Sequence, residues 1–286
     1  MKRREWIGSL TALALSGLSA YANKKSAFFP EGLMKEEEKQ TESWTQGNIR
    51  FTWLQDNTGE KRMPNSLFSG ADSKTIQQLS PEGGALASIS CFLVQSNGKN
   101  LLFDTGNGNA DSRLLPNLSS LQIQPEDIDY LFLTHFHGDH IGGMLSQGKV
   151  VFTKAEVYVP QKEYEAWMQM PADKNQQVVK TMKAYEKKLH QINAGDKLPE
   201  GVIALNAFGH TPGHTIYQIK DTLIIGDLLH GAAIQIPHPE VCASFDMDKT
   251  LAIQNRKQYL QYVKDKHLIM AGMHLPAPGF MDWKKI

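Results

Sequence analysis

The sequence predicts a layered α/β domain, and three observations support this fold class. Short runs rich in β-branched and aromatic residues alternate with segments whose apolar residues recur three and four positions apart, as in amphipathic helices. This alternation is similar in the two halves of the chain. A length of 286 residues, 41% of them hydrophobic, suffices for one large domain. Periodicity leaves two arrangements open, a doubly wound sheet or two sheets packed together with helices outside.

The first 22 residues have the pattern of an export signal. Three basic residues at positions 2–4 precede an apolar stretch over residues 6–18, and residues 20–22 form a small-x-small cleavage site. The apolar stretch is shorter than the ~20 residues that span a bilayer, so we expect no stable membrane insertion after cleavage. Export by a Sec or twin-arginine signal would make the protein periplasmic or secreted. Residues 23–47 are polar and predict a tether, and the folded domain is expected over 48–286.

The predicted strands and helices of the domain follow one another along the chain. Strands are expected at residues 49–54, 89–94, 100–103, 130–134, 150–152, 157–159, 202–207, 215–219, 222–225 and 268–271. Helices are expected at residues 112–120, 162–168, 176–190 and 248–265.

Charge and cysteine content exclude several classes of protein. The chain has 30 Lys and Arg and 30 Asp and Glu, so no net charge favours nucleic acid, and a small-molecule substrate fits better.

The sequence also argues against a nucleotide site and a disulfide framework. Residues 104–108 lack the third glycine of a dinucleotide-binding loop. With only Cys91 and Cys242, no disulfide framework holds the fold; two buried thiols are favoured and one bridge stays open. The sequence leaves a homodimer open.

The motif at residues 134–140 carries the chemistry. Thr134-His135-Phe136-His137-Gly138-Asp139-His140 places three imidazoles and a carboxylate directly after an apolar run. In an extended segment His135 and His137 point the same way and can bind one ion. Gly138 turns the chain, so that Asp139 and His140 can serve a second ion nearby.

Further metal ligands must come from other parts of the chain. The candidates are His214, Asp227 and His274, each of which follows an apolar run on a predicted loop. His214 ends the segment Gly209-His210-Thr211-Pro212-Gly213-His214, in which Pro and Gly predict a tight turn. The spacing of His210, His230 and His238 fits no ligand role, and we interpret them as residues behind the ligands or at the surface.

Together with Leu101-Leu102-Phe103-Asp104-Thr105-Gly106, these four segments resemble, in order, the five motifs of the metallo-β-lactamase superfamily. The resemblance spans residues 101–274 and implies an αββα sandwich of four layers with metals at the sheet edge. It also implies two divalent ions, zinc first and manganese or iron as alternatives. By the resemblance, His135, His137 and His214 hold one ion, Asp139, His140 and His274 hold the other, and Asp227 bridges both. Asp104 would brace the ligand loop from behind.

A closer similarity is to the branch of methyl parathion hydrolase and related lactonases. It covers most of residues 48–279 and includes Trp167, which matches an aromatic residue of that branch's pocket. Trp167 alternatively belongs to the core face of an amphipathic helix. Phe68 and Phe280 are further candidates for the pocket wall. The chain departs from the branch because residues 107–113 contain no aromatic side chain, which weakens the expectation of phosphotriesterase activity.

The expected function is therefore an exported dinuclear metal-dependent hydrolase. A hydroxide that bridges the metals would attack the carbonyl or phosphoryl centre of a lactone, aryl ester or phosphotriester, and Asp139 and Asp227 would be the catalytic carboxylates. The alternatives are an iron-dependent persulfide dioxygenase with a single ion, a β-lactamase, and a metal-binding module without catalysis.

Overall fold

The computed structural model describes residues 40–283. The predicted signal peptide at 1–22 and most of the predicted tether lie outside the described residues. Among the helices between residues 40 and 283, none combines the length and the apolar composition that crossing a bilayer requires. Both cysteines, Cys91 and Cys242, are buried free thiols.

The first sheet has seven strands and begins as a meander. The strand order is β1-β2-β6-β7-β8-β11-β12, and the pairs from β1 to β7 are antiparallel whereas the remaining pairs are parallel. Its strands are β1 (Thr41–Gln46), β2 (Ile49–Gln55), β6 (Ser90–Ser96), β7 (Lys99–Phe103), β8 (Tyr130–Phe132), β11 (Glu156–Pro160) and β12 (Leu189–Ile192).

The second sheet has five strands in the order β13-β14-β15-β17-β18. Only the β15·β17 pair is parallel. The strands are β13 (Ile203–Asn206), β14 (Thr215–Ile219), β15 (Thr222–Ile224), β17 (Ile269–Ala271) and β18 (Phe280–Asp282).

The two sheets pack face to face through an aromatic core. Phe103 and Phe132 of the first sheet stack with ring centroids 5.1 Å apart, and Tyr217 of the second sheet lies 5.5 Å from Phe103. Successive residues of a strand point to opposite faces: on β6, Phe92 faces the second sheet, and Leu93 faces the helices outside. This period of two is what a sheet covered on both faces requires.

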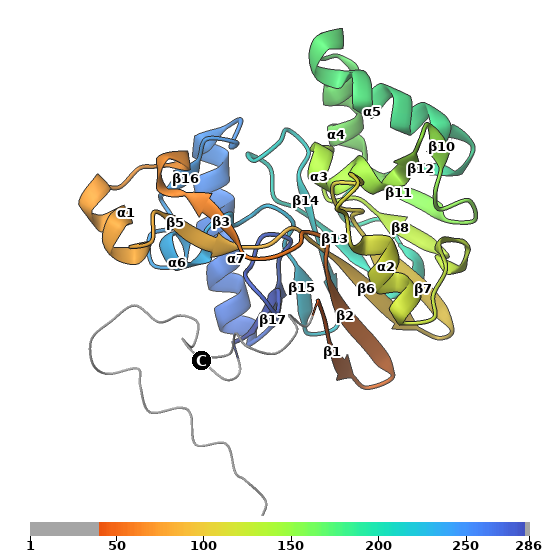
Figure 1. Ribbon diagram of the computed structural model, residues 1–286, viewed down its shortest axis with the longest axis horizontal. Helices are drawn as coiled ribbons and strands as arrows, with labels where there is room; N and C mark the ends of the chain where they lie inside the picture. Colours follow the sequence, from red (N-terminus) through yellow and green to blue (C-terminus); the bar gives the residue numbers. More distant parts are fainter. Residues whose placement is uncertain (1–39, 284–286) are drawn as a thin grey trace, which may run out of the picture. The chain divides into compact units, whose positions relative to one another are not determined.

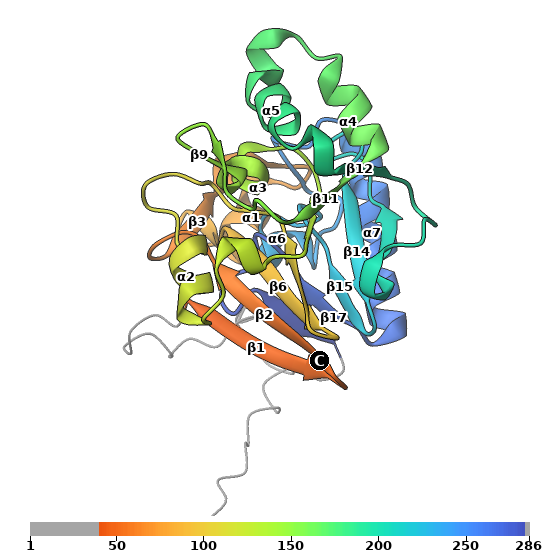
Figure 2. The ribbon, with the colours of Figure 1, turned by 90° about the vertical axis from the view of Figure 1, so that its right-hand side faces the viewer.

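Helices cover the outer faces of both sheets, as Figures 1 and 2 show. On the first sheet the covering helices are α2 (Leu114–Ser120), α4 (Gln161–Met168) and α5 (Ala172–Ala184). The second sheet is covered by α7 (Lys249–Lys266), whose Tyr259 hydroxyl donates to the carbonyl of Asn206. The order is helix, sheet, sheet, helix, so the αββα prediction is confirmed.

A small lobe, residues 61–87 and 231–243, lies at one end of the sandwich and was not predicted (Figure 1). Its strands are two to four residues long and carry too little periodicity to be recognised. They are β3 (Lys61–Pro64), β4 (Phe68–Ser69), β5 (Gly84–Ala87) and β16 (Cys242–Ala243), with helices α1 (Ser73–Leu79) and α6 (Ala232–Gln235). The remaining short elements are α3 (Gly138–Ile141), β9 (Leu145–Ser146) and β10 (Lys149–Val150).

Two predicted boundaries are wrong. The polar segment taken as a tether up to residue 47 contains β1, an edge strand that pairs with β2 over its whole length. Trp44 anchors β1 by stacking on Phe51 at 5.2 Å, a contact that a polar composition does not reveal. The helix expected at 176–190 is α5, which lies earlier, and β12 occupies the end of that range.

Candidate metal centre

Loops at one edge of the sandwich carry the predicted ligands. Residues 134–140 follow β8, and His137 precedes α3, which begins at Gly138. Asp227 follows β15, and His274 follows β17, the parallel neighbour of β15. Parallel strands bring their carboxyl ends to the same edge, which is why segments far apart in the sequence converge there.

The first donor group consists of His135, His137, His210 and Asp227. His137 Nδ1 lies 3.1 Å from His135 Nε2 and 2.9 Å from His210 Nε2. His210 Nε2 lies 3.2 Å from Asp227 Oδ2.

The second donor group consists of Asp139, His140 and His274. Asp139 oxygens lie 3.7 Å from His140 Nε2 and 3.5 Å from His274 Nε2. Asp227 joins this group to the first, because its Oδ1 is 3.0 Å from His140 Nε2 and its Oδ2 is 3.1 Å from His274 Nε2.

These separations fit divalent metal ions. Tetrahedral zinc bonds of about 2.0–2.1 Å place ligand atoms about 3.3 Å apart, within the range of the distances above. His140 Nε2 and Asp227 Oδ1 are buried and have no hydrogen-bond partner among the described residues. Buried polar atoms in that state are costly unless a cation binds them. The donor set, imidazole nitrogens with carboxylate oxygens, is also one that zinc accepts.

His214 does not belong to either donor group, contrary to the prediction. Its Nδ1 lies 2.9 Å from the carbonyl of Ala207, to which it can donate, and its Nε2 accepts from the amide of Asp227 at 3.0 Å. Both ring nitrogens are thus used by the backbone. The other histidine of the same motif, His210, occupies the place expected for His214. His214 instead fixes the loop that carries Asp227.

The second ring nitrogen of most ligand histidines is held in place. His140 Nδ1 lies 2.7 Å from Asp104 Oδ2, so Asp104 stands behind the ligand loop, where the resemblance put it. His274 Nδ1 lies 2.8 Å from the carbonyl of Ser88. His210 Nδ1 lies 3.2 Å from Asp246 Oδ1, a carboxylate that sequence reasoning missed. Such partners fix the tautomer and orientation of each ring.

Asp246 is in turn held by a buried arginine. Arg256 of α7 donates to Asp246 Oδ2 at 2.9 Å and to the carbonyls of Leu228, Pro239 and Val241. The ion pair is buried on both sides, and its fixed geometry passes to His210.

The proximity of the carboxylates and imidazoles shifts their pKa values. Burial lowers the pKa of His140, but the carboxylates of Asp227, Asp104 and Asp139 outweigh it and hold the pKa well above its usual range. Burial likewise lowers the pKa of His210, but the carboxylates of Asp227 and Asp246 outweigh burial and raise this pKa to about 9. For His137, burial and the neighbouring His210 lower the pKa to about 3. A cation at the site would compete with protons on His140 and His210.

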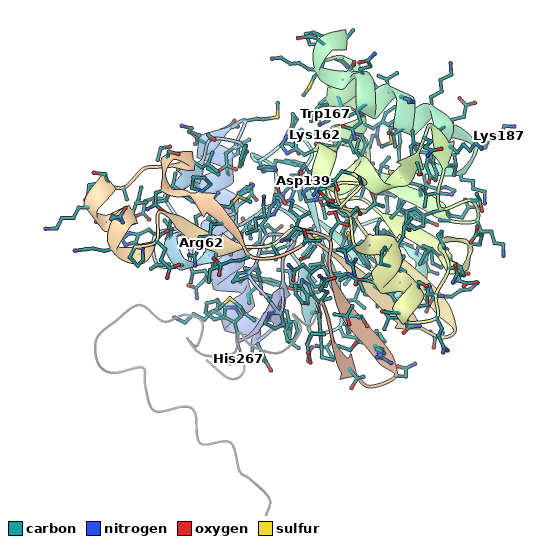
Figure 3. All side chains as sticks on the ribbon, viewed as in Figure 1. Arg62, Asp139, Lys162, Trp167, Lys187 and His267 are labelled. Atoms are coloured by element: carbon teal, nitrogen blue, oxygen red, sulfur yellow. The ribbon has the colours of Figure 1, made fainter. Side chains whose placement is uncertain are left out.

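Of the three predicted pocket residues, one faces the donor groups. Trp167, labelled in Figure 3, is buried in the core under the first sheet's helices, and its ring lies edge-on to His137 with ring centroids 5.8 Å apart. Phe68 is buried in the core of the small lobe. Phe280 packs on Trp44 at 4.2 Å in the core between the sheets. Both rings are used for packing, and the assignment of Phe68 and Phe280 to a pocket wall stays a prediction.

Two exposed apolar residues that were not predicted contact His230 and the backbone of His210. Phe245 is 42% exposed, and its ring lies 5.5 Å from the ring of His230. Met247 is 53% exposed, and its amide donates to the carbonyl of His210. His230 is itself buried, with Nε2 3.2 Å from Asp227 Oδ2.

Comparison with known proteins agrees with this geometry. The model of the metallo-β-lactamase superfamily matches residues 85–274. A hydroxyacylglutathione hydrolase of Methylobacillus flagellatus is 28% identical over 146 residues, which cover 49% of this chain and 47% of that protein. The match thus spans about half the length of this relative.

Solved structures resemble the chain over a larger share of its length. The hydrolase AbOPH of the β-lactamase superfamily is 26% identical with a TM-score of 0.78, covering 86% of this chain and 94% of AbOPH. AidC, a dizinc quorum-quenching lactonase solved with a product, N-hexanoyl-L-homoserine, is 25% identical with a TM-score of 0.77, covering 85% of this chain and 92% of AidC.

Proposed function

Because the chain belongs to the metallo-β-lactamase superfamily, we propose that it is a dinuclear metal-dependent hydrolase that opens lactones or cleaves aryl esters. The observation that carries the proposal is the sharing of Asp227 by two donor groups. A mononuclear site would need only one of these groups. Zinc is the proposed ion, because imidazole and carboxylate donors at tetrahedral spacing suit it.

The choice of lactones and aryl esters has two supports. AidC, which resembles this chain over most of its length, is a dizinc lactonase. The exposed Phe245 and Met247 beside the first donor group offer an apolar surface to an acyl chain or aryl ring. Phosphotriesters rank below because no aromatic residue is present at 107–113.

The residues of the site divide the chemical work among them. When bound, two divalent ions would supply an acidified water and polarise the carbonyl of the substrate. Asp227 holds the donor groups together, and the braces behind the histidines keep their ligand nitrogens aimed at the centre. The side chain of Asp139 is 29% exposed, so its carboxylate oxygens can take a proton from water and return it to the leaving alkoxide. Trp167 limits access of water on one side.

Export to the periplasm or the medium is part of the proposal and depends on residues 1–22. The test is to express the full-length chain, separate the intracellular fraction from the exported fraction, and determine the N-terminal sequence of the protein in each. A mature chain that begins shortly after residue 22 supports cleavage. A chain that stays inside the cell with its first residues intact contradicts it.

The test of the function combines metal analysis with two substrates. We expect the purified chain to contain two zinc ions, and Asp227→Ala to lose metal together with hydrolysis of an aryl lactone. A phosphotriester assayed in parallel should be hydrolysed more slowly. A single iron, together with oxygen uptake on a persulfide substrate, would indicate a dioxygenase and not a hydrolase. Absence of bound metal would contradict both functions.

The control is Asp221→Asn. This residue lies in the turn between β14 and β15, directly before the strand that leads to Asp227. It should retain both ions and the lactonase rate. Equal loss in the two variants would point to damage of the strand and not of the shared ligand.

A further inference from the structure

We propose that Glu163 positions the first donor group and Trp167 together, as a buried carboxylate that ties two histidine loops to one helix. The inference rests on the proposed metal function and goes beyond it, since Glu163 is neither a ligand nor in contact with substrate. Nothing in the sequence distinguishes it from other glutamates on amphipathic helices.

Glu163 lies on α4 and is fully buried, at 0% exposure. Four groups donate hydrogen bonds to its two oxygens. Oε1 accepts from the amide of Phe136 at 3.1 Å and from Trp167 Nε1 at 2.6 Å. Oε2 accepts from Thr211 Oγ1 and from the amide of Gly213, both at 2.8 Å.

The partners of Glu163 belong to the loops that carry the first donor group. Phe136 stands between His135 and His137, and Thr211 follows His210 directly. The first loop follows β8 of one sheet, whereas the second joins β13 to β14 of the other. One carboxylate therefore fixes the spacing of ligands that come from different sheets.

Close packing supports this role. A side chain at Gly213 would collide with the backbone of α4 at Glu163, so helix and loop are in direct contact. Trp167, one turn further along α4, holds its indole N–H on Glu163 and its ring against His137. The carboxylate thus also sets where the Trp167 ring stands relative to His137.

All four partners donate, so a carboxylate is the chemical group that satisfies them. Burial raises the pKa of Glu163, and the donated hydrogen bonds act in the opposite direction. A glutamine of the same shape would turn its NH2 toward one of the two donor pairs. The donors that lose their acceptor are buried, and at least one loop must then shift. Ligand geometry tolerates only about 0.5 Å of such displacement.

The test compares Glu163→Gln with Glu165→Gln in the full chain. Glu165 lies two residues away on α4 and is exposed, which makes it a matched control. Zinc affinity of the metal-free protein is measured by competition with a chromophoric chelator, and the ligand geometry by the visible spectrum of the cobalt form. We expect Glu163→Gln to bind zinc about 10- to 100-fold more weakly, with a changed cobalt spectrum. Glu165→Gln should match the wild type.

A purely structural role for Glu163 predicts a different result. In that case Glu163→Gln would lower the melting temperature of the metal-free protein but leave the zinc affinity and the cobalt spectrum of the folded fraction unchanged. This result overturns the proposal. If Glu163→Gln does not fold, Thr211→Val, which removes one donor and keeps the carboxylate, should weaken zinc binding about threefold. Wild-type affinity in that variant overturns the proposal as well.

Failure of the inference is distinct from failure of the proposed function. If wild-type protein binds no zinc, the metal function itself is wrong. If the wild type binds two ions and Glu163→Gln binds them equally well, only the role of Glu163 is wrong.

Discussion

The two donor groups differ in how the protein holds them. In the first group His210 is braced by Asp246 and Arg256, and Glu163 ties the two loops that carry the histidines. In the second group Asp104 braces His140 and a backbone carbonyl holds His274, but the third member, Asp139, reaches solvent. The difference therefore lies mainly in the exposure of Asp139. If each group holds an ion, as proposed, we expect the ion of the second group to exchange more readily.

The largest effect on metal binding and activity is expected from substitution of His210, a candidate ligand of the first donor group. His210→Ala should remove one ion and lower kcat/KM for an aryl lactone by about 1,000-fold, because the first donor group loses a ligand. His214→Gln should keep both ions, since a glutamine oxygen can accept from the Asp227 amide. Elemental analysis of both variants gives the answer. If His214→Gln loses an ion and His210→Ala does not, the reassignment of the ligand is wrong.

Asp246→Asn should produce the next largest effect. The change removes the charged partner of His210 Nδ1 and leaves Arg256 buried without its counter-ion. Zinc affinity of the first site should fall about 10- to 100-fold, and urea unfolding should show a lower stability. Asp248→Ala, which removes the N-cap of α7, is the control and should cost stability alone. Unchanged zinc affinity in Asp246→Asn would show that the brace does not act on the metal.

Asp139→Asn tests whether the second donor group can lose its ion independently of the first. Because Asp139 is the partly exposed ligand, its loss should release the second ion and leave the first in place. Dialysis against a weak chelator, followed by metal analysis, should find one ion per chain. Loss of both ions at the same chelator concentration would mean that the two groups bind as one unit.

The smallest effect concerns pH and the metal-free protein. Burial and the neighbouring His210 lower the pKa of His214 to about 3. Below the ordinary histidine value of about 6.5 the unfolded chain binds a proton that the folded chain does not, so stability falls as pH falls. Urea unfolding between pH 6.5 and 4.5 should show a slope that is shallower in His214→Gln by up to ~1.4 kcal/mol per pH unit. Equal slopes would mean that His214 is already protonated in the fold.

Local patterns predicted the strands and most of the candidate ligands, whereas the choice of the sandwich came from the resemblance to the metallo-β-lactamase superfamily. Apolar runs that end in His or Asp mark strands that deliver side chains to one edge, as for Asp227 and His274. The choice between His210 and His214 depends on which ring meets the backbone of Ala207 and Asp227, and no pattern encodes that. Glu163 escaped notice for the same reason, since three of its four partners lie on other loops and two of these are backbone amides.

Arg256 connects the outermost helix of the second sheet to the chemistry at the edge. Its guanidinium bonds to Asp246 and to three carbonyls, one of which belongs to Leu228 beside Asp227. If α7 undocks, all of these bonds are lost at once. Slow amide exchange along α7 and retention of the proposed ions should therefore rise and fall together, so that docking of an outer-layer helix controls how long metal stays bound.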